Sequence, residues 1–169
     1  AGYGTAARLE YLLIPIAFGL GTPLVAMVGA SIGAGDRQRA LRIVLAGGVV
    51  AFAITEAVGL AAALFPEVWL HLFTRDATAI AVGSQYLRVA GPFFGFFGFG
   101  IGMYFALLGA GQLFWPIVGS VLRSVIAAVG GVFAVFVLGS MPAMFAFIAA
   151  AFVVSGVIPL LALRKANWR

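Results

Sequence analysis

The chain has 169 residues, of which 64% are hydrophobic and only 9% charged, and this balance excludes a soluble domain, whose surface needs more polar side chains. Its apolar runs of twenty and more residues also exclude a membrane β-barrel, whose strands are short and alternate in hydrophobicity. The net charge of +5 raises the possibility of nucleic-acid binding. The predicted fold class is all-α integral membrane: a polytopic helix bundle with about five transmembrane helices.

The first two predicted spans cover residues 8–34 and 43–65. The first contains 25 consecutive uncharged residues, from Tyr11 to Gly35, which in a helix exceed the hydrocarbon core of about 30 Å. The second is interrupted only by Glu56.

The remaining three spans come from two longer apolar segments. The uncharged run from Val89 to Leu122 would form a helix of about 51 Å, too long for one crossing without a large tilt. The glycines of the 109–112 segment mark a turn that divides it. The 139–142 segment, which contains Gly139 and Pro142, marks the next turn. The predicted spans are 85–108, 113–138 and 143–163.

The charges sort by membrane face. One predicted face carries the whole net charge of +5, and on the other face acids and bases cancel. The basic residues of the first face are Arg37, Arg39, Arg42, Arg164, Lys165 and Arg169, with Asp36 as its acid. This is the positive-inside pattern, so the loop with Arg37, Arg39 and Arg42 and the C-terminus are expected on the cytoplasmic side of the cell (inner) membrane. A nucleic-acid partner is not expected, because a phosphate-binding stripe would not sort by membrane face.

Small residues form a stripe in the third span. Its members recur at helical spacing: Gly91, Gly95, Gly98, Gly102, Ala106 and Gly109. Such a stripe lets another helix approach closely, and helix packing is the favoured interpretation. A sliding or substrate-facing surface is the alternative.

Glu56 and Arg123 are the ionisable residues deepest in the apolar runs, and each costs about 3 kcal/mol to insert unless it finds a partner or a wet cavity. Both lie on small-residue faces, at depths that differ by about 6 Å, so a buried ion pair between them is one prediction. The functional alternative makes Glu56 a protonatable or cation-binding carboxylate.

Other polar residues have plainer interpretations. Glu10 is a further cavity candidate, although it lies near the outer end of the first span and is alternatively interfacial. His71 and Arg88 are expected at the membrane interface. The sequence contains no metal-ligand spacing, phosphate loop or nucleophile elbow, so no metal, no cofactor and no enzymatic activity are expected.

Several short motifs together resemble a half-transporter of the multidrug and toxic compound extrusion family. In order they are Gly19–Pro23 (GLGTP), Val28–Asp36 (VGASIGAGD), Arg39-Ala40, Tyr86–Arg88 (YLR) and Leu108–Gly111 (LGAG) followed by Pro116. Their order and spacing resemble helices two to six of one six-helix half.

The resemblance implies a secondary antiporter that exports organic, mostly cationic small molecules by alternating access, with protons or sodium as the coupling ion. It also implies a partner lobe in the same protein. The first residue is Ala1 and the first methionine Met27, so we expect the chain to be part of a longer protein. A natural end after Arg169 would make it the C-terminal lobe. Tyr104 and Phe97 are candidates for the substrate cleft. A lipid-linked sugar flippase of the same broad superfamily and a non-transporting membrane scaffold are the alternatives.

Overall fold

The structure, a computed structural model, describes residues 2–163, and these contain helices and turns but no strand. The elements are α1 (Gly2–Gly33), α2 (Arg37–Leu64), α3 (Pro66–Leu70), α4 (Ala77–Ala90), the 3-10 turn η1 (Gly91–Phe93), α5 (Phe94–Gly109), α6 (Phe114–Phe136) and α7 (Met141–Leu163). Five segments are long and apolar enough to cross a membrane, with α4, η1 and α5 counting as one. The predicted all-α polytopic bundle is confirmed.

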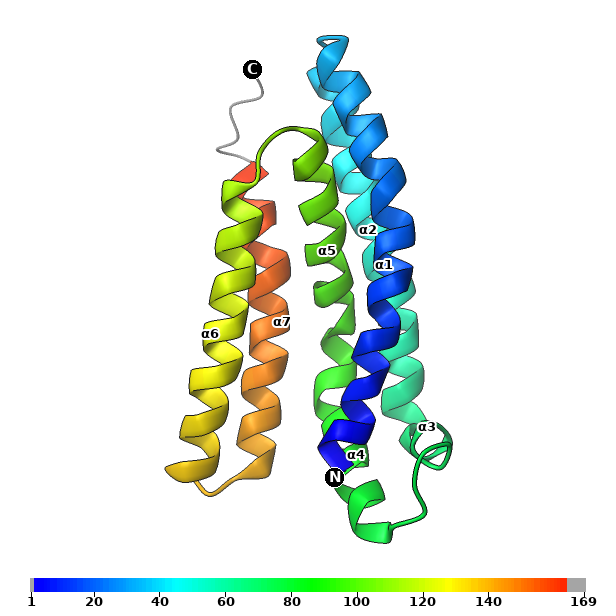
Figure 1. Cartoon of the computed structure of the whole chain (residues 1–169), viewed down its shortest axis with the longest axis vertical. Coiled ribbons are helices and arrows are strands. Elements are labelled where there is room, and N and C mark those ends of the chain that lie inside the picture. Colours follow the sequence, from blue (N-terminus) through cyan, green and yellow to red (C-terminus); the bar gives the residue numbers. More distant parts are fainter. Residues whose placement is uncertain (1, 164–169) are drawn as a thin grey trace.

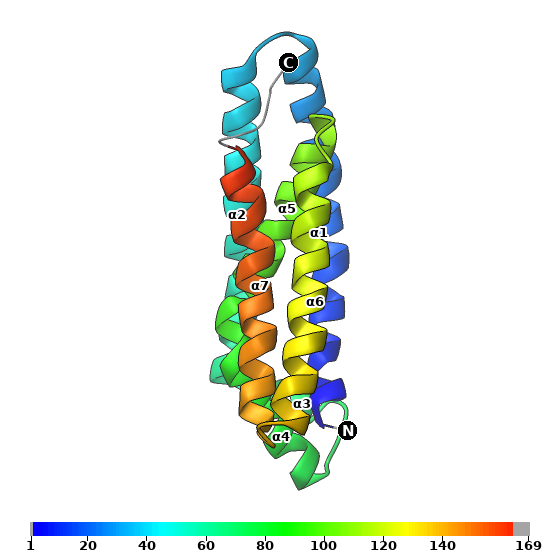
Figure 2. The same cartoon turned by 90° about the vertical axis from the view of Figure 1, so that its left-hand side faces the viewer.

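The helices run nearly parallel to the long axis, and α5 lies at the centre of the bundle (Figure 1). On one side α5 packs against α1 and α2, and on the other side it packs against α7, which forms a hairpin with α6. The turns α1–α2 and α5–α6 lie at one end, here called the basic end, and α3 and the α6–α7 turn lie at the opposite end, here called the α3 end (Figure 2).

The third membrane-spanning segment begins at Ala77, whereas the sequence led us to expect residue 85. Asp76 explains the earlier start, because its carboxylate accepts hydrogen bonds from the N–H groups of Thr78 and Ala79 and so caps α4. The helix is interrupted at η1, where Pro92 lacks the N–H that a continuous helix would need. The third span therefore consists of two helices joined within the bundle.

Most of the glycine stripe packs against α2. A Cβ atom on Gly91 would lie 2.6 Å from the carbonyl oxygen of Gly59, and one on Gly102 would lie 3.1 Å from the Cβ atom of Ala51. Gly95 and Gly98 face α2 in the same way, while Gly109 lies against Val25 of α1. The missing side chains allow α5 to approach both neighbours at backbone distance.

Candidate transport cavity

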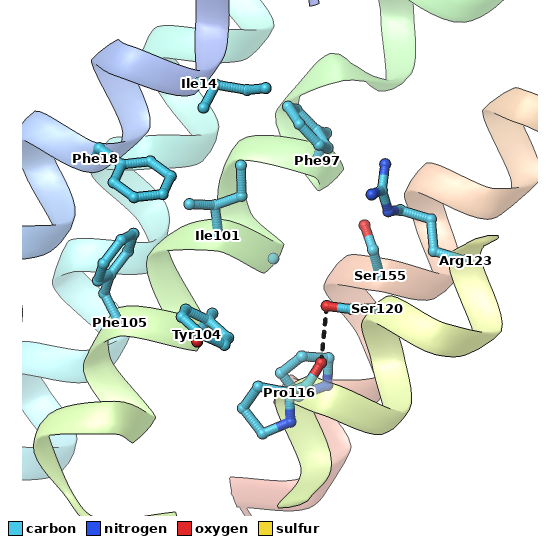
Figure 3. Close-up of a pocket in the computed structure, with 12 residues that line it drawn as sticks. Ile14, Phe18, Phe97, Ile101, Tyr104, Phe105, Pro116, Ser120, Arg123 and Ser155 are labelled. Carbon is cyan, nitrogen blue, oxygen red and sulfur yellow. Dashed lines mark hydrogen bonds between the residues drawn. The ribbon is translucent and has the colours of Figure 1, made fainter. Parts of the chain in front are cut away.

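A cavity of about 270 Å³ lies between α1, α5, α6 and α7. The structure brings Tyr104, Phe97 and Arg123 together in its wall (Figure 3). The other lining residues are Ile14, Phe18, Gly100, Ile101, Phe105, Pro116, Ser120, Ser155 and Pro159. The wall is thus mainly apolar and aromatic, with few polar groups, as in many small-molecule sites.

The aromatic side chains of the wall contact one another. The rings of Phe18 and Phe105 lie 4.9 Å apart, and those of Tyr104 and Phe105 lie 5.5 Å apart, both edge to face. This geometry suits the ring quadrupoles and holds the three side chains as one surface from α1 to α5. A planar aromatic group has a ready surface here.

Arg123 supplies the positive charge in the wall. Its guanidinium carbon lies 5.4 Å from the centroid of the Phe97 ring, and the side chain points from α6 toward α5 (Figure 3). The two wall hydroxyls bond to their own helices: Ser120 donates to the carbonyl of Pro116 at 3.0 Å, and Ser155 donates to that of Phe152 at 2.7 Å. Arg123 therefore determines the charge of this surface.

Glu10 on α1 is a carboxylate within the electrostatic range of this charge. Its carboxylate accepts a hydrogen bond from the hydroxyl of Tyr86 on α4, and the charge of Arg123 acts on it across the bundle. The Tyr86 side chain is fully buried, with the rings of Tyr3 and Phe145 at 5.0 and 5.3 Å. Glu10 is thus partly buried against α4 and lies beside the cavity, not among its lining residues.

Glu56 has a different environment. Its Oε2 accepts a hydrogen bond from the backbone N–H of Gly95 at 2.6 Å. Gly95 lies in the first turn of α5, where the break at η1 leaves N–H groups without intrahelical acceptors. The carboxylate of Glu56 therefore caps a helix N-terminus within the membrane, where its negative charge also suits the helix dipole.

The predicted ion pair between Glu56 and Arg123 is not formed among the described residues. Glu56 contacts the face of α5 that packs on α2, whereas Arg123 contacts Phe97 on the cavity side of α5. The depth estimate from the sequence treated only position along the membrane normal. A whole helix separates the two side chains laterally.

Tyr86 is the residue of this region that our sequence reasoning did not propose as part of the site. Its place within an apolar span could have indicated a buried hydrogen bond, because a buried phenol usually finds a hydrogen-bond partner. Its partner lies 76 residues away in the sequence, so only the packed bundle identifies it.

The remaining predicted site residues lie outside the cavity. Arg37, Arg39 and Arg42 are exposed at the basic end. Arg164, Lys165 and Arg169 lie outside the described residues. Within residues 2–163, no cluster of three or more His, Cys, Asp or Glu side chains is arranged to hold a metal ion.

Comparisons with known proteins agree on one family. A family model described as MatE matches residues 1–133. A curated protein of Thermotoga maritima, described as "Probable multidrug resistance protein NorM", is 27% identical over 118 residues. This match covers 70% of the present chain but 25% of the relative, so the chain spans a quarter of that protein's length. No solved structure matches the chain.

Proposed function

Since the chain belongs to the MatE family, we propose that it forms most of one lobe of a secondary active transporter that exports organic, mostly cationic compounds. The name of the Thermotoga maritima relative supports multidrug export as the activity. A second lobe of the same protein would complete the cleft, and alternating access between the lobes would move the substrate. The membrane would be the cell (inner) membrane, with the basic end in the cytoplasm.

The observation that carries this proposal is the cavity with its aromatic wall and its nearby carboxylate. The volume of about 270 Å³ falls just below the range of about 300–1,000 Å³ typical of small-molecule pockets. It would hold a coupling ion with water, or one ring system of a larger compound. The rings of Phe18, Phe105 and Tyr104 would contact a flat aromatic ring of such a compound.

Glu10 is the residue we propose for ion coupling. It lies within a membrane-spanning helix, bonds to one uncharged donor, Tyr86, and lies within the field of the cation Arg123. Binding of a proton or sodium ion would change its charge and so its attraction to Arg123. Because Glu10 is on α1 and Arg123 on α6, this change would alter how strongly the two helices across the cavity attract each other.

Glu56 is less suited to this role because its carboxylate already stabilises the start of α5. We retain it as the second coupling candidate. The two residues can be compared directly, because both are carboxylates in membrane-spanning helices and both can be replaced by the nearly isosteric glutamine.

The test is transport by the full-length protein in liposomes, with an aromatic fluorescent cation as substrate and an imposed proton or sodium gradient. We expect Glu10→Gln to reduce gradient-driven transport at least about tenfold, which corresponds to the loss of one hydrogen bond to a charged group, about 1.5–3 kcal/mol. Glu56→Gln should retain most of the activity. Glu67→Gln, at an exposed position of α3, is the matched control and should transport normally.

Three outcomes would overturn the proposal. Normal coupling in Glu10→Gln would remove this residue from the mechanism. Gradient-independent movement of an anionic lipid-linked sugar, without cation transport, would favour the flippase alternative. No flux of any substrate from a folded, full-length protein would favour the scaffold alternative.

A further inference from the structure

A groove on the outer surface of the bundle lies between α1 and α2, away from the cavity. It has a volume of about 440 Å³ and is lined by apolar residues of both helices, among them Pro23, Met27, Ala46 and Val50. Those four side chains are exposed, and this part of both helices belongs to the membrane-spanning segments. The groove is therefore open on the surface of the described residues, at the depth of a membrane-spanning segment.

The groove continues into a basic recess toward the basic end. The recess has a volume of about 290 Å³ and is lined by Ala26, Met27, Ala30, Ser31 and Arg39. Met27 lines both spaces, so they adjoin at this residue. The groove and the recess together, here called the depression, have an apolar part at membrane depth and a cationic part beside Arg39.

The charge at the recess is net positive. Arg37 and Arg42 lie in the same loop and helix start as Arg39, and all three are exposed. Asp36 is the neighbouring acid, and its Oδ1 accepts a hydrogen bond from the backbone N–H of Arg39 at 2.9 Å. The carboxylate therefore caps α2, while the guanidinium of Arg39 lines the recess.

The length of the depression matches one lipid leaflet. Gly19 lines the far end of the groove and Ser31 the recess, which at 1.5 Å per residue is about 18 Å along α1. Half of a hydrocarbon core is about 15 Å thick. An acyl chain that enters from the headgroup level at Arg39 would thus reach Gly19 near the middle of the bilayer.

We propose that this depression binds one anionic phospholipid, with an acyl chain in the groove of α1 and α2 and the phosphate at Arg39. Basic recesses between membrane helices on the cytoplasmic side are suited to anionic headgroups. The apolar groove alone would take any acyl chain, so the selectivity for an anionic lipid comes from Arg39. The site is separate from the transport cavity and does not depend on the proposed function.

The test uses the full-length protein in detergent with equal amounts of phosphatidylglycerol and phosphatidylcholine that carry identical acyl chains. Native mass spectrometry measures which lipid stays bound. We expect phosphatidylglycerol to be preferred and Arg39→Gln to reduce this preference about fivefold, the effect of one basic residue near a membrane surface. Arg37→Gln makes the same change of net charge in the same loop outside the recess, and it should reduce the preference less than Arg39→Gln.

The acyl part is tested separately. Ala46→Phe places a ring in the groove and should reduce retention of both lipids, whereas Ala53→Phe, on an exposed position of α2 outside the groove, should not. A phosphatidylglycerol with a photoreactive acyl chain should crosslink to the peptide that contains Met27.

The proposal is wrong if the wild-type protein retains both lipids equally, or if Arg39→Gln and Arg37→Gln behave alike. It is also wrong if Ala46→Phe and Ala53→Phe retain lipid equally. Crosslinking of the groove to the other lobe instead of to lipid would likewise overturn it, because a protein surface would then cover the groove.

Discussion

At the scale of single residues, the two carboxylates within the membrane-spanning helices differ in the kind of donor that they bind. Glu10 accepts from the side chain of Tyr86 on another helix, whereas Glu56 accepts from a backbone N–H at the start of α5. A side-chain hydroxyl can rotate or move away with its helix, but the N–H of Gly95 is part of the helix itself. Glu10 is therefore the carboxylate whose environment can change between two states of the bundle.

The hydrogen bond between Tyr86 and Glu10 should contribute to the stability of the folded protein. In a double-mutant cycle with Tyr86→Phe and Glu10→Gln, we expect an interaction energy of about 1 kcal/mol, within the range for side-chain hydrogen bonds in membranes. Unfolding of the detergent-solubilised protein measures it. Additive effects of the two substitutions would show that the pair does not interact energetically.

The capping role of Glu56 predicts a difference between two replacements. Glu56→Leu removes the acceptor of the Gly95 N–H and should lower the free energy of unfolding by about 1–2 kcal/mol. Glu56→Gln keeps an acceptor oxygen and loses only the charge near the helix dipole, so its cost should be about 0.5 kcal/mol. Chemical denaturation compares the two variants. Equal losses of stability would argue against capping.

At the scale of the elements, hydropathy predicted the five spans, because in lipid a helix forms the hydrogen bonds of its backbone N–H and C=O groups within one segment. The break at η1 was harder to predict, although Pro92 marks it, because the cost of the unpaired N–H groups depends on a capping residue from another helix. The spacing of the glycines predicted which side of α5 packs against another helix. The sequence did not predict the pairing of Glu10 with Tyr86, because this pairing depends on how α1 and α4 are rotated relative to each other.

The contact of η1 and α5 with α2 predicts that its glycines tolerate no side chain. Gly91→Ala would place a methyl group 2.6 Å from the Gly59 carbonyl oxygen, so the helices must separate, at a cost of about 2 kcal/mol. Gly33→Ala, where no atom lies within 4 Å of the added Cβ, is the control and should be neutral or slightly stabilising. Thermal unfolding in detergent measures both. A neutral Gly91→Ala would show that the interface is looser than the structure indicates.

At the scale of the whole molecule, α5 divides the bundle into two parts with different surroundings. The α1–α2 side is held to α5 at backbone distance, whereas the α6–α7 hairpin contacts α5 chiefly through α7 and leaves the cavity beside α6. Movement of α6 relative to α1 would therefore change the cavity with little disturbance of the glycine interface. Arg123 therefore lies on a helix that packs extensively against α7 but has little contact with α5.

The orientation of the molecule gives a last prediction. The turns α1–α2 and α5–α6 lie together at the basic end, so cysteines placed at Gln38 and Leu113 should react with a reagent supplied from the same side of the membrane. The charge distribution predicts the cytoplasmic side for both. Cysteines at Ala77 and Leu138, at the α3 end, should react from the outside.

The chain has no native cysteine, so the labelling of each single replacement can be measured in a full-length protein made cysteine-free elsewhere. Labelling of Gln38→Cys and Ala77→Cys from the same side would contradict the arrangement, and labelling of all four positions from the reversed sides would show that the bundle is inserted in the opposite orientation.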